Sequence, residues 1–114
     1  MNKNYKIDTA LKELGHPENQ LGTGYLRLAC REWYPGIMLT KELYPGIAKA
    51  VGSTPSRVER AMRHSIETAW MRSPLDTQLR YFGNTIDPQR GKPTVGEYVA
   101  TVALICREGL PGAN

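Results

Sequence analysis

The sequence predicts an all-α protein made of six helices. Eleven glycines and eight prolines divide its 114 residues into segments of helix length. In these segments apolar residues recur every three or four positions, and none shows the period of two that a half-buried strand requires. A chain of this length can bury one core but not two, so we expect residues 1–114 to form a single domain.

The first two segments predict a platform of two helices. The first helix spans residues 8–14 and is followed by Gly15, a residue type that commonly ends helices. The second runs from about residue 20 to residue 34, where Pro35 and Gly36 stop it. The stripe that we expect along one side of this second helix consists of Leu21, Tyr25, Leu28, Ala29 and Glu32.

A third helix is predicted from Thr40, a favourable N-cap, to Val51, with Gly52 closing it. Pro45 lies inside this segment and has no backbone N–H to donate. It either kinks the helix or marks its true start, in which case the two residues before it belong to a preceding turn. The sequence leaves both alternatives open.

The fourth predicted helix is the longest. Thr54 is a favourable N-cap, and Pro55 at the first helical position already has the φ angle of a helix. The helical pattern then continues without a break to about Arg72.

Two shorter helices follow. Ser73 and Pro74 repeat the signal of a cap followed by proline, for a fifth helix that ends before Gly83. Thr94 caps a sixth helix that reaches about Arg107. The remaining segments, predicted as an exposed loop and two frayed ends, are residues 84–93, 1–5 and 109–114.

The spacing across the third and fourth helices is typical of a helix-turn-helix. Ala48 is followed by Gly52 four residues later and by Val58 six residues after that. In this motif a small residue lets the second helix cross, a glycine takes the left-handed conformation of the turn, and an aliphatic residue packs between the helices. Ile47 and Val51 are expected to supply the remaining apolar contacts.

The fourth helix has two opposite faces. At 100° per residue, its small and apolar residues gather on one side and its charged residues on the other. The inward cluster is Val58, Ala61, Met62, Ser65 and Ala69, and the outward cluster is Ser56, Arg57, Arg60, Arg63, His64 and Glu67. Arginines replace counterions at phosphates and pair with guanine in the major groove, so the outward cluster predicts a surface for double-stranded DNA.

Position along the helix divides the candidate DNA contacts. The N-terminal end of a recognition helix usually approaches the bases. The candidates for reading bases are Ser56, Arg57 and Glu59, the last by accepting from a cytosine amino group. The candidates for contacts with phosphates, further along the helix, are Arg60, Arg63 and His64.

The same side chains also fit a solvated surface without a ligand. Carboxylates and arginines pair at spacings of three and four residues, as Glu59 and Arg63 can. For His64 the alternative is a surface or capping histidine, and Tyr44 and Trp70 are expected in the core rather than stacked on bases. The helix-turn-helix spacing directly upstream favours DNA.

Other classes of function find no support in the sequence. It has no nucleophile elbow, no glycine-rich phosphate loop and no metal-ligand spacing, so we expect no enzyme activity, no cofactor and no metal. Cys30 and Cys106 are expected to be reduced core residues, with a disulfide as the alternative. The absence of a signal peptide and of a long apolar run indicates a cytoplasmic protein outside the membrane, and the net charge of +4 permits a polyanionic partner.

Several strings in the chain resemble one known family. The most specific is SRVERAMRHSIE at residues 56–67, and the others are GTGYLRLA at 22–29, LYPGIAK at 43–49, FG at 82–83 and KPT at 92–94. They resemble the C-terminal effector domain of the stage-zero sporulation response regulator, the master transcription factor of endospore formation. The resemblance covers nearly the whole chain and implies a six-helix DNA-binding domain.

The resemblance also implies a target and the partners. The family recognises a short box resembling TGTCGAA, which assigns Arg57 to a guanine and Glu59 to a cytosine. It places two domains head to tail on adjacent boxes, and it contacts the housekeeping sigma factor of RNA polymerase through what are here about residues 73–85. Pro74 and Arg80 make this last segment bulkier and more basic than the family pattern, which weakens the expectation of that contact.

Two questions stay open at the level of sequence. The alternative to a DNA-binding transcription factor domain is a protein-interaction module that binds the sigma factor or a partner regulator without DNA specificity of its own. Full-length members of the family also carry a phosphoacceptor receiver domain upstream, and these 114 residues contain none. The sequence is therefore either an excised domain or a natural single-domain relative.

Overall fold

The computed structural model describes residues 3–83 and 91–110. Within these residues the chain forms helices and turns and no strand, so the predicted all-α class is confirmed. The six α-helices are α1 (Lys3–Glu13), α2 (Leu21–Glu32), α3 (Tyr44–Val51), α4 (Pro55–Arg72), α5 (Leu75–Phe82) and α6 (Val95–Glu108). A π-helical turn, η1 (Leu39–Leu43), leads directly into α3.

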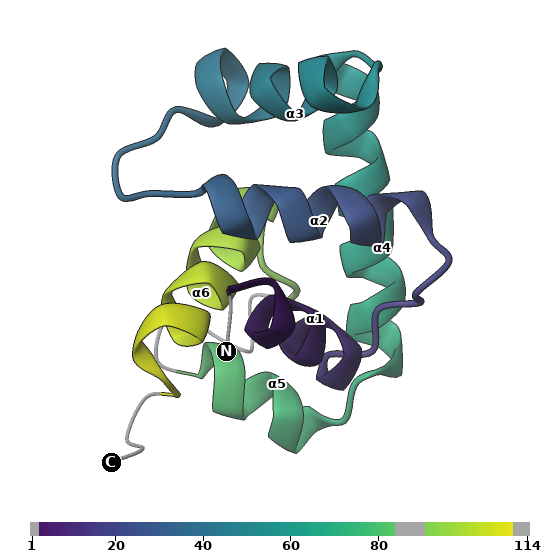
Figure 1. Cartoon of the computed structure of the whole chain (residues 1–114). Coiled ribbons are helices and arrows are strands. Elements are labelled where there is room, and N and C mark those ends of the chain that lie inside the picture. The colour runs from purple at the N-terminus through teal and green to yellow at the C-terminus, as the bar shows by residue number, and fades with distance from the viewer. Residues whose placement is uncertain (1–2, 84–90, 111–114) are drawn as a thin grey trace.

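The long helix α4 spans the molecule. Figure 1 shows α3 at one end and α5 at the other, with α4 reaching from one to the other and α1, α2 and α6 lying between. Every helix contributes side chains to one apolar core. The largest side chains at its centre, each at most 1% exposed, include Leu26 of α2, Met62 of α4 and Tyr98 of α6.

Helices α2 and α4 approach each other closely. Gly22 faces Ala61 at the crossing, and a Cβ atom on residue 22 would lie 1.9 Å from the Ala61 carbonyl oxygen. The two nearest atoms that this Cβ would meet are the carbonyl oxygen and carbon of Ala61. Because both belong to the backbone of α4, they cannot move aside without shifting the helix. The absence of a side chain at Gly22 therefore sets the distance between the platform and α4.

The local signals that predicted most helix ends are confirmed. The Thr54 hydroxyl accepts a hydrogen bond from the Arg57 N–H at 3.3 Å, and α4 runs from Pro55 to Arg72 as predicted. Thr94 forms a complete capping box with Glu97 at the start of α6. Gly15 follows α1 with a φ of 94°, which explains why a glycine stands there.

The start of the third helix differs from the prediction. Thr40 is not its N-cap: it lies inside η1, and the carboxylate of Glu42 accepts a hydrogen bond from the Met38 N–H at 2.9 Å. Pro45 occupies the first turn of α3, where its missing N–H costs no hydrogen bond. The alternative in which Pro45 marks the start of the helix is therefore correct in part: Leu43 belongs to the preceding π-helical turn, whereas Tyr44 is already the first residue of α3.

The two platform helices also depart from their predicted limits. α1 begins at Lys3, so part of the predicted frayed end is helical, and α2 ends at Glu32 because the next residue turns extended. The buried side of α2 is rotated from the predicted stripe: Leu21 is 65% exposed and Leu26 is fully buried. The rotation brings Gly22 against α4, which the apolar stripe alone did not reveal.

Three smaller features also differ from the prediction: the cap of α5, the exposure of Val51 and the burial of Pro93. Ser73 does not cap α5, because Pro74 is the residue that precedes the helix and makes no side-chain cap. Val51 is 36% exposed and adds little to the contact between α3 and α4. Pro93 is buried, although the segment before α6 was expected to be exposed, and residues 84–90 of that segment lie outside the described residues.

Candidate nucleic-acid interface

The predicted helix-turn-helix forms with the expected geometry. Ala48 is 3% exposed and Val58 is fully buried, so both lie in the contact between α3 and α4. Gly52 has φ 70° and ψ 39°, the left-handed conformation that the turn requires. The N–H of Ser53 donates to the Ala48 carbonyl at 2.9 Å and closes the turn.

The faces of α4 divide as the periodicity predicted. Its buried side chains are Val58, Met62, Ser65, Ile66 and Ala69. On the opposite side the exposed residues are Ser56, Arg57, Arg60, Arg63 and His64, with Glu59 partly buried at the edge. All six predicted site residues therefore share one accessible surface, and their contacts with DNA stay a prediction.

Two ion pairs lie on this surface. Arg63 donates to the Glu59 carboxylate at 3.1 Å, as the solvated-face alternative expected for residues four apart. The ammonium group of Lys92, from the segment before α6, lies 3.6 Å from the carboxylate of Glu67. The surface therefore carries paired cations from two segments of the chain, Arg63 beside Glu59 and Lys92 beside Glu67. Exposed pairs of this kind are weak and are readily exchanged for other partners.

A buried polar network holds the inner face of α4. The two ring nitrogens of His16 bond to the hydroxyls of Ser65 at 2.8 Å and Tyr98 at 2.7 Å. Thr23 of α2 shares the Ser65 hydroxyl at 3.0 Å. The network joins α4 to α2, to α6 and to the turn after α1. It fixes α4 both along its axis and about it, since hydrogen bonds are directional.

Burial keeps the His16 ring neutral. Loss of solvent, together with the nearby positive charge of Arg72, lowers the pKa of His16 from 6.5 to about 4. A neutral imidazole has one donor and one acceptor nitrogen, which matches two hydroxyl partners that can each take either role. His16 is therefore a structural histidine at neutral pH.

Sequence reasoning missed three residues that shape this interface: His16, Gly22 and Lys92. The contacts of His16 join residues 49 and 82 positions apart, and no local pattern reports such distances. Gly22 lies within the family-like string at residues 22–29, and a glycine inside a helix was a usable sign of close packing. Lys92 lies in the KPT string, whose position beside α4 depends on the whole fold.

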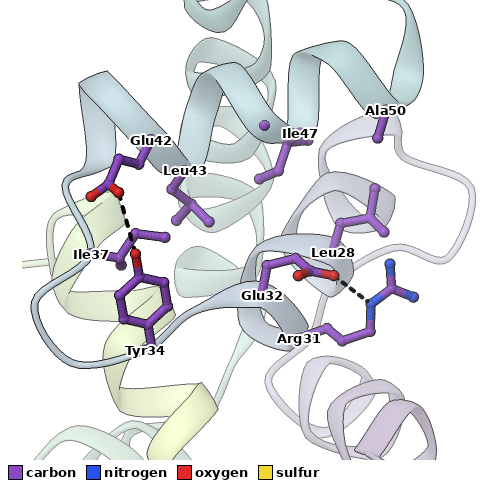
Figure 2. A pocket seen from close by; sticks show the side chains of 10 residues that line it. Leu28, Arg31, Glu32, Tyr34, Ile37, Glu42, Leu43, Ile47 and Ala50 are labelled. Carbon is purple, nitrogen blue, oxygen red and sulfur yellow. Dashed lines mark hydrogen bonds and ion pairs between the residues drawn. The ribbon is translucent and has the colours of Figure 1, made fainter.

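A hollow lies away from this surface, between α2 and the segment formed by η1 and α3. Figure 2 shows its apolar floor, which includes Leu28, Leu43 and Ile47. The polar groups at its rim pair with one another, because Arg31 bonds to Glu32 at 3.2 Å and the Tyr34 hydroxyl donates to Glu42 at 3.3 Å. The lining contains no histidine or cysteine, the usual groups for nucleophilic or metal chemistry.

Two other kinds of site are absent from the part of the chain that the structure describes. No group of three or more metal-ligating side chains occurs among residues 3–83 and 91–110. No helix in that part of the chain is long and apolar enough to cross a membrane. Cys30 and Cys106 are both free, and burial raises the pKa of the Cys30 thiol, so this thiol is unreactive.

Comparison with known protein families identifies a match over most of the chain. A family model described as the C-terminal part of sporulation initiation factor Spo0A matches residues 7–105. The match includes the whole helix-turn-helix, the segment around Lys92 and nearly all of α6.

Proposed function

The chain belongs to the Spo0A C-terminal family, and from this premise we propose that it is a single DNA-binding domain whose helix α4 recognises a box resembling TGTCGAA. The family is one of DNA-binding domains in sporulation and transcription regulation, and not one of enzymes. The box, the residues that read it and action in the cytoplasm are our proposals for this chain.

The observation that carries the proposal is the exposed, arginine-rich face at the front of α4. The Thr54 cap and the turn at Gly52 fix where this end of the helix begins. Ser56 and Arg57 follow at once and are exposed, while the other side of the same turn is anchored by the buried Val58. A rigid helix end with free donors is the element that a major groove admits.

The residues of this face divide between two roles. We assign Arg57 to the O6 and N7 atoms of a guanine, because a guanidinium fork matches both acceptors. We assign Glu59 to the amino group of a cytosine; its pair with Arg63 engages one carboxylate oxygen and leaves the other available. The side chains assigned to phosphates are Arg60, Arg63 and His64.

Substitution of Arg57 tests the base-reading role. We expect Arg57→Ala to cost about 1–3 kcal/mol at the box and to relax the preference at one base position. Fluorescence anisotropy with the box, its single-position variants and a scrambled duplex measures both effects. Equal loss on the box and on the scrambled duplex would contradict the assignment of Arg57 to a base.

One observation favours a second function for the same domain. Helix α5 exposes Leu75 and Leu79, 64% and 44% accessible, four residues apart on one side of the helix, with Met71 at the end of α4 88% exposed. Such apolar side chains suit a partner protein better than DNA. We propose that residues 73–85, described as far as residue 83, contact the sigma factor of RNA polymerase.

Separate titrations distinguish the two functions. We expect Leu75→Ser together with Leu79→Ser to abolish binding to a sigma-factor fragment and to leave affinity for the box unchanged. Binding to sigma factor with no preference for the box over scrambled DNA would instead support the protein-interaction alternative. Two copies on adjacent boxes are also proposed, and a gel shift with one box and with two tests for tighter binding of the second copy.

A further inference from the structure

Lys92 lies outside the helix-turn-helix but on the same surface. Its ammonium group is 3.6 Å from Glu67 on the outer side of α4, and its side chain is 46% exposed. The cleft between the two segments is lined by Glu59 and Arg63 from α4 and by Lys92 and Thr94 from the segment before α6. A positive charge from a distant part of the sequence therefore borders the proposed recognition helix.

The backbone beside Lys92 is held in place. Pro93 is buried, and its ring removes one rotational freedom of the chain. The next residue, Thr94, donates its N–H to Glu97 at 2.9 Å, and its hydroxyl accepts from the Glu97 N–H at 3.1 Å. The origin of the Lys92 side chain is therefore fixed relative to α6, and α6 packs against α4.

The position of Lys92 along α4 suits a phosphate and not a base. Glu67 is ten residues beyond Arg57, which places Lys92 about 15 Å along the helix from the base-reading end. The major groove is about 12 Å wide, so a group at this distance reaches the sugar-phosphate strand at its border. A lysine ammonium is a compact cation that suits a phosphate without reading sequence.

From these observations we propose that Lys92 contacts the DNA backbone at the edge of the groove entered by α4, and that Glu67 holds it there in the free protein. Phosphate then replaces the carboxylate as the partner of the ammonium group. The inference rests on the proposed DNA-binding function and adds to it a contact from outside the helix-turn-helix. The two residues have different roles: Glu67 pairs with the cation in the free protein, and Lys92 makes the contact with DNA.

The test is the salt dependence of binding, measured by fluorescence anisotropy on the full chain with box and scrambled duplexes from 50 to 300 mM KCl. Each phosphate contact contributes about 0.9 to the slope of log affinity against log salt. We expect Lys92→Gln to lower the slope by about that amount and to weaken both duplexes roughly fivefold to tenfold at 0.1 M salt. Lys92→Arg should keep the native slope.

Two further variants separate a contact from a general or structural effect. Lys12→Gln removes an exposed lysine of α1 and should leave the slope unchanged; a loss equal to that of Lys92→Gln would overturn the proposal. Glu67→Gln breaks the same ion pair but keeps the cation, so it should retain the native slope. A slope lowered as much as in Lys92→Gln would show that only the ion pair matters.

Failure of the contact is distinguishable from failure of the proposed function. If the native chain prefers the box and depends on salt but Lys92→Gln changes neither the slope nor the affinity, the Lys92 contact alone is wrong. If the native chain binds neither duplex, or binds both without salt dependence, the proposed DNA-binding function of this chain is wrong as well.

Discussion

The inner and outer faces of α4 are maintained by different interactions. The inner face meets α2 at the distance of backbone contact through Gly22 and shares a buried network with His16. The outer face carries exposed ion pairs such as that of Arg63 with Glu59. Buried packing and satisfied hydrogen bonds stabilise a fold, whereas exposed ion pairs add little. The interactions that stabilise the fold and the proposed surface for DNA are therefore located on opposite sides of one helix.

The largest effect is expected where α2 crosses α4. Gly22→Ala would place a Cβ atom 1.9 Å from the Ala61 carbonyl oxygen, so the helices must separate. We expect a loss of about 3 kcal/mol in the free energy of unfolding, the upper part of the usual range for overpacking. Urea unfolding followed by circular dichroism measures this loss.

The matched control lies two residues away on the same helix. Gly24 has no atom within 4 Å of where its Cβ would be, and Gly24→Ala should stabilise the protein by about 0.5–1 kcal/mol through helix propensity. If the two alanine variants had equal stability, the close crossing of α2 and α4 would be refuted. The contrast between the faces of α4 would then lose its strongest support.

A slightly smaller effect is expected from acid. Since the pKa of His16 falls from 6.5 to about 4 on folding, the unfolded chain binds a proton between these values and the folded chain does not. The contribution of His16 to the free energy of unfolding is therefore complete above pH 6.5. As the pH falls towards 4, this free energy decreases by on the order of 2–3 kcal/mol.

The pH prediction is measured against a variant that cannot titrate. His16→Gln should be less stable than the native protein at pH 7, because it loses buried hydrogen bonds. The difference should narrow steadily between pH 6.5 and pH 4 in urea unfolding. A constant difference over this range would mean that His16 is protonated equally in the folded and unfolded chains.

The smallest effect on stability is expected on the outer face. Arg63→Ala breaks the pair with Glu59 and should change the free energy of unfolding by no more than about 0.5 kcal/mol. The same variant should weaken box and scrambled duplexes alike and lower the salt slope by about 0.9. Arg31→Ala, which removes a similar exposed pair with Glu32, should change neither the affinity for the two duplexes nor the salt slope.

The helices could be predicted because their signals are local. Thr54 with Pro55, and Thr94 as a cap, mark the starts of two helices within one or two residues, and the structure places α4 and α6 accordingly. The π-helical turn before α3 has no such signature. The turn is accompanied by a hydrogen bond from the Met38 N–H to the Glu42 carboxylate and by the burial of Leu43, and the Thr40 cap signal reports neither of these contacts.

The exposed residues of the candidate site could be predicted from the sequence, but the contacts that hold and border α4 could not. The period of α4 alone separated Arg57, Arg60 and Arg63 from the buried side. The contacts that hold this helix and border it come from residues far away in sequence, such as His16 and Lys92. Their positions follow from how α2 and α6 pack, which no window of residues along the chain reports.

The contact of Gly22 with Ala61 also divides α4 into two arms of unequal length. Ala61 is four residues from Arg57 and eleven from Arg72, so the two arms of α4 are about 6 Å and about 16 Å long. A tilt about this point would move the proposed base-reading end little more than a third as far as the opposite end. Binding of a partner protein at α5, as proposed, would therefore displace the proposed base-reading residues less than the end of α4 beside it.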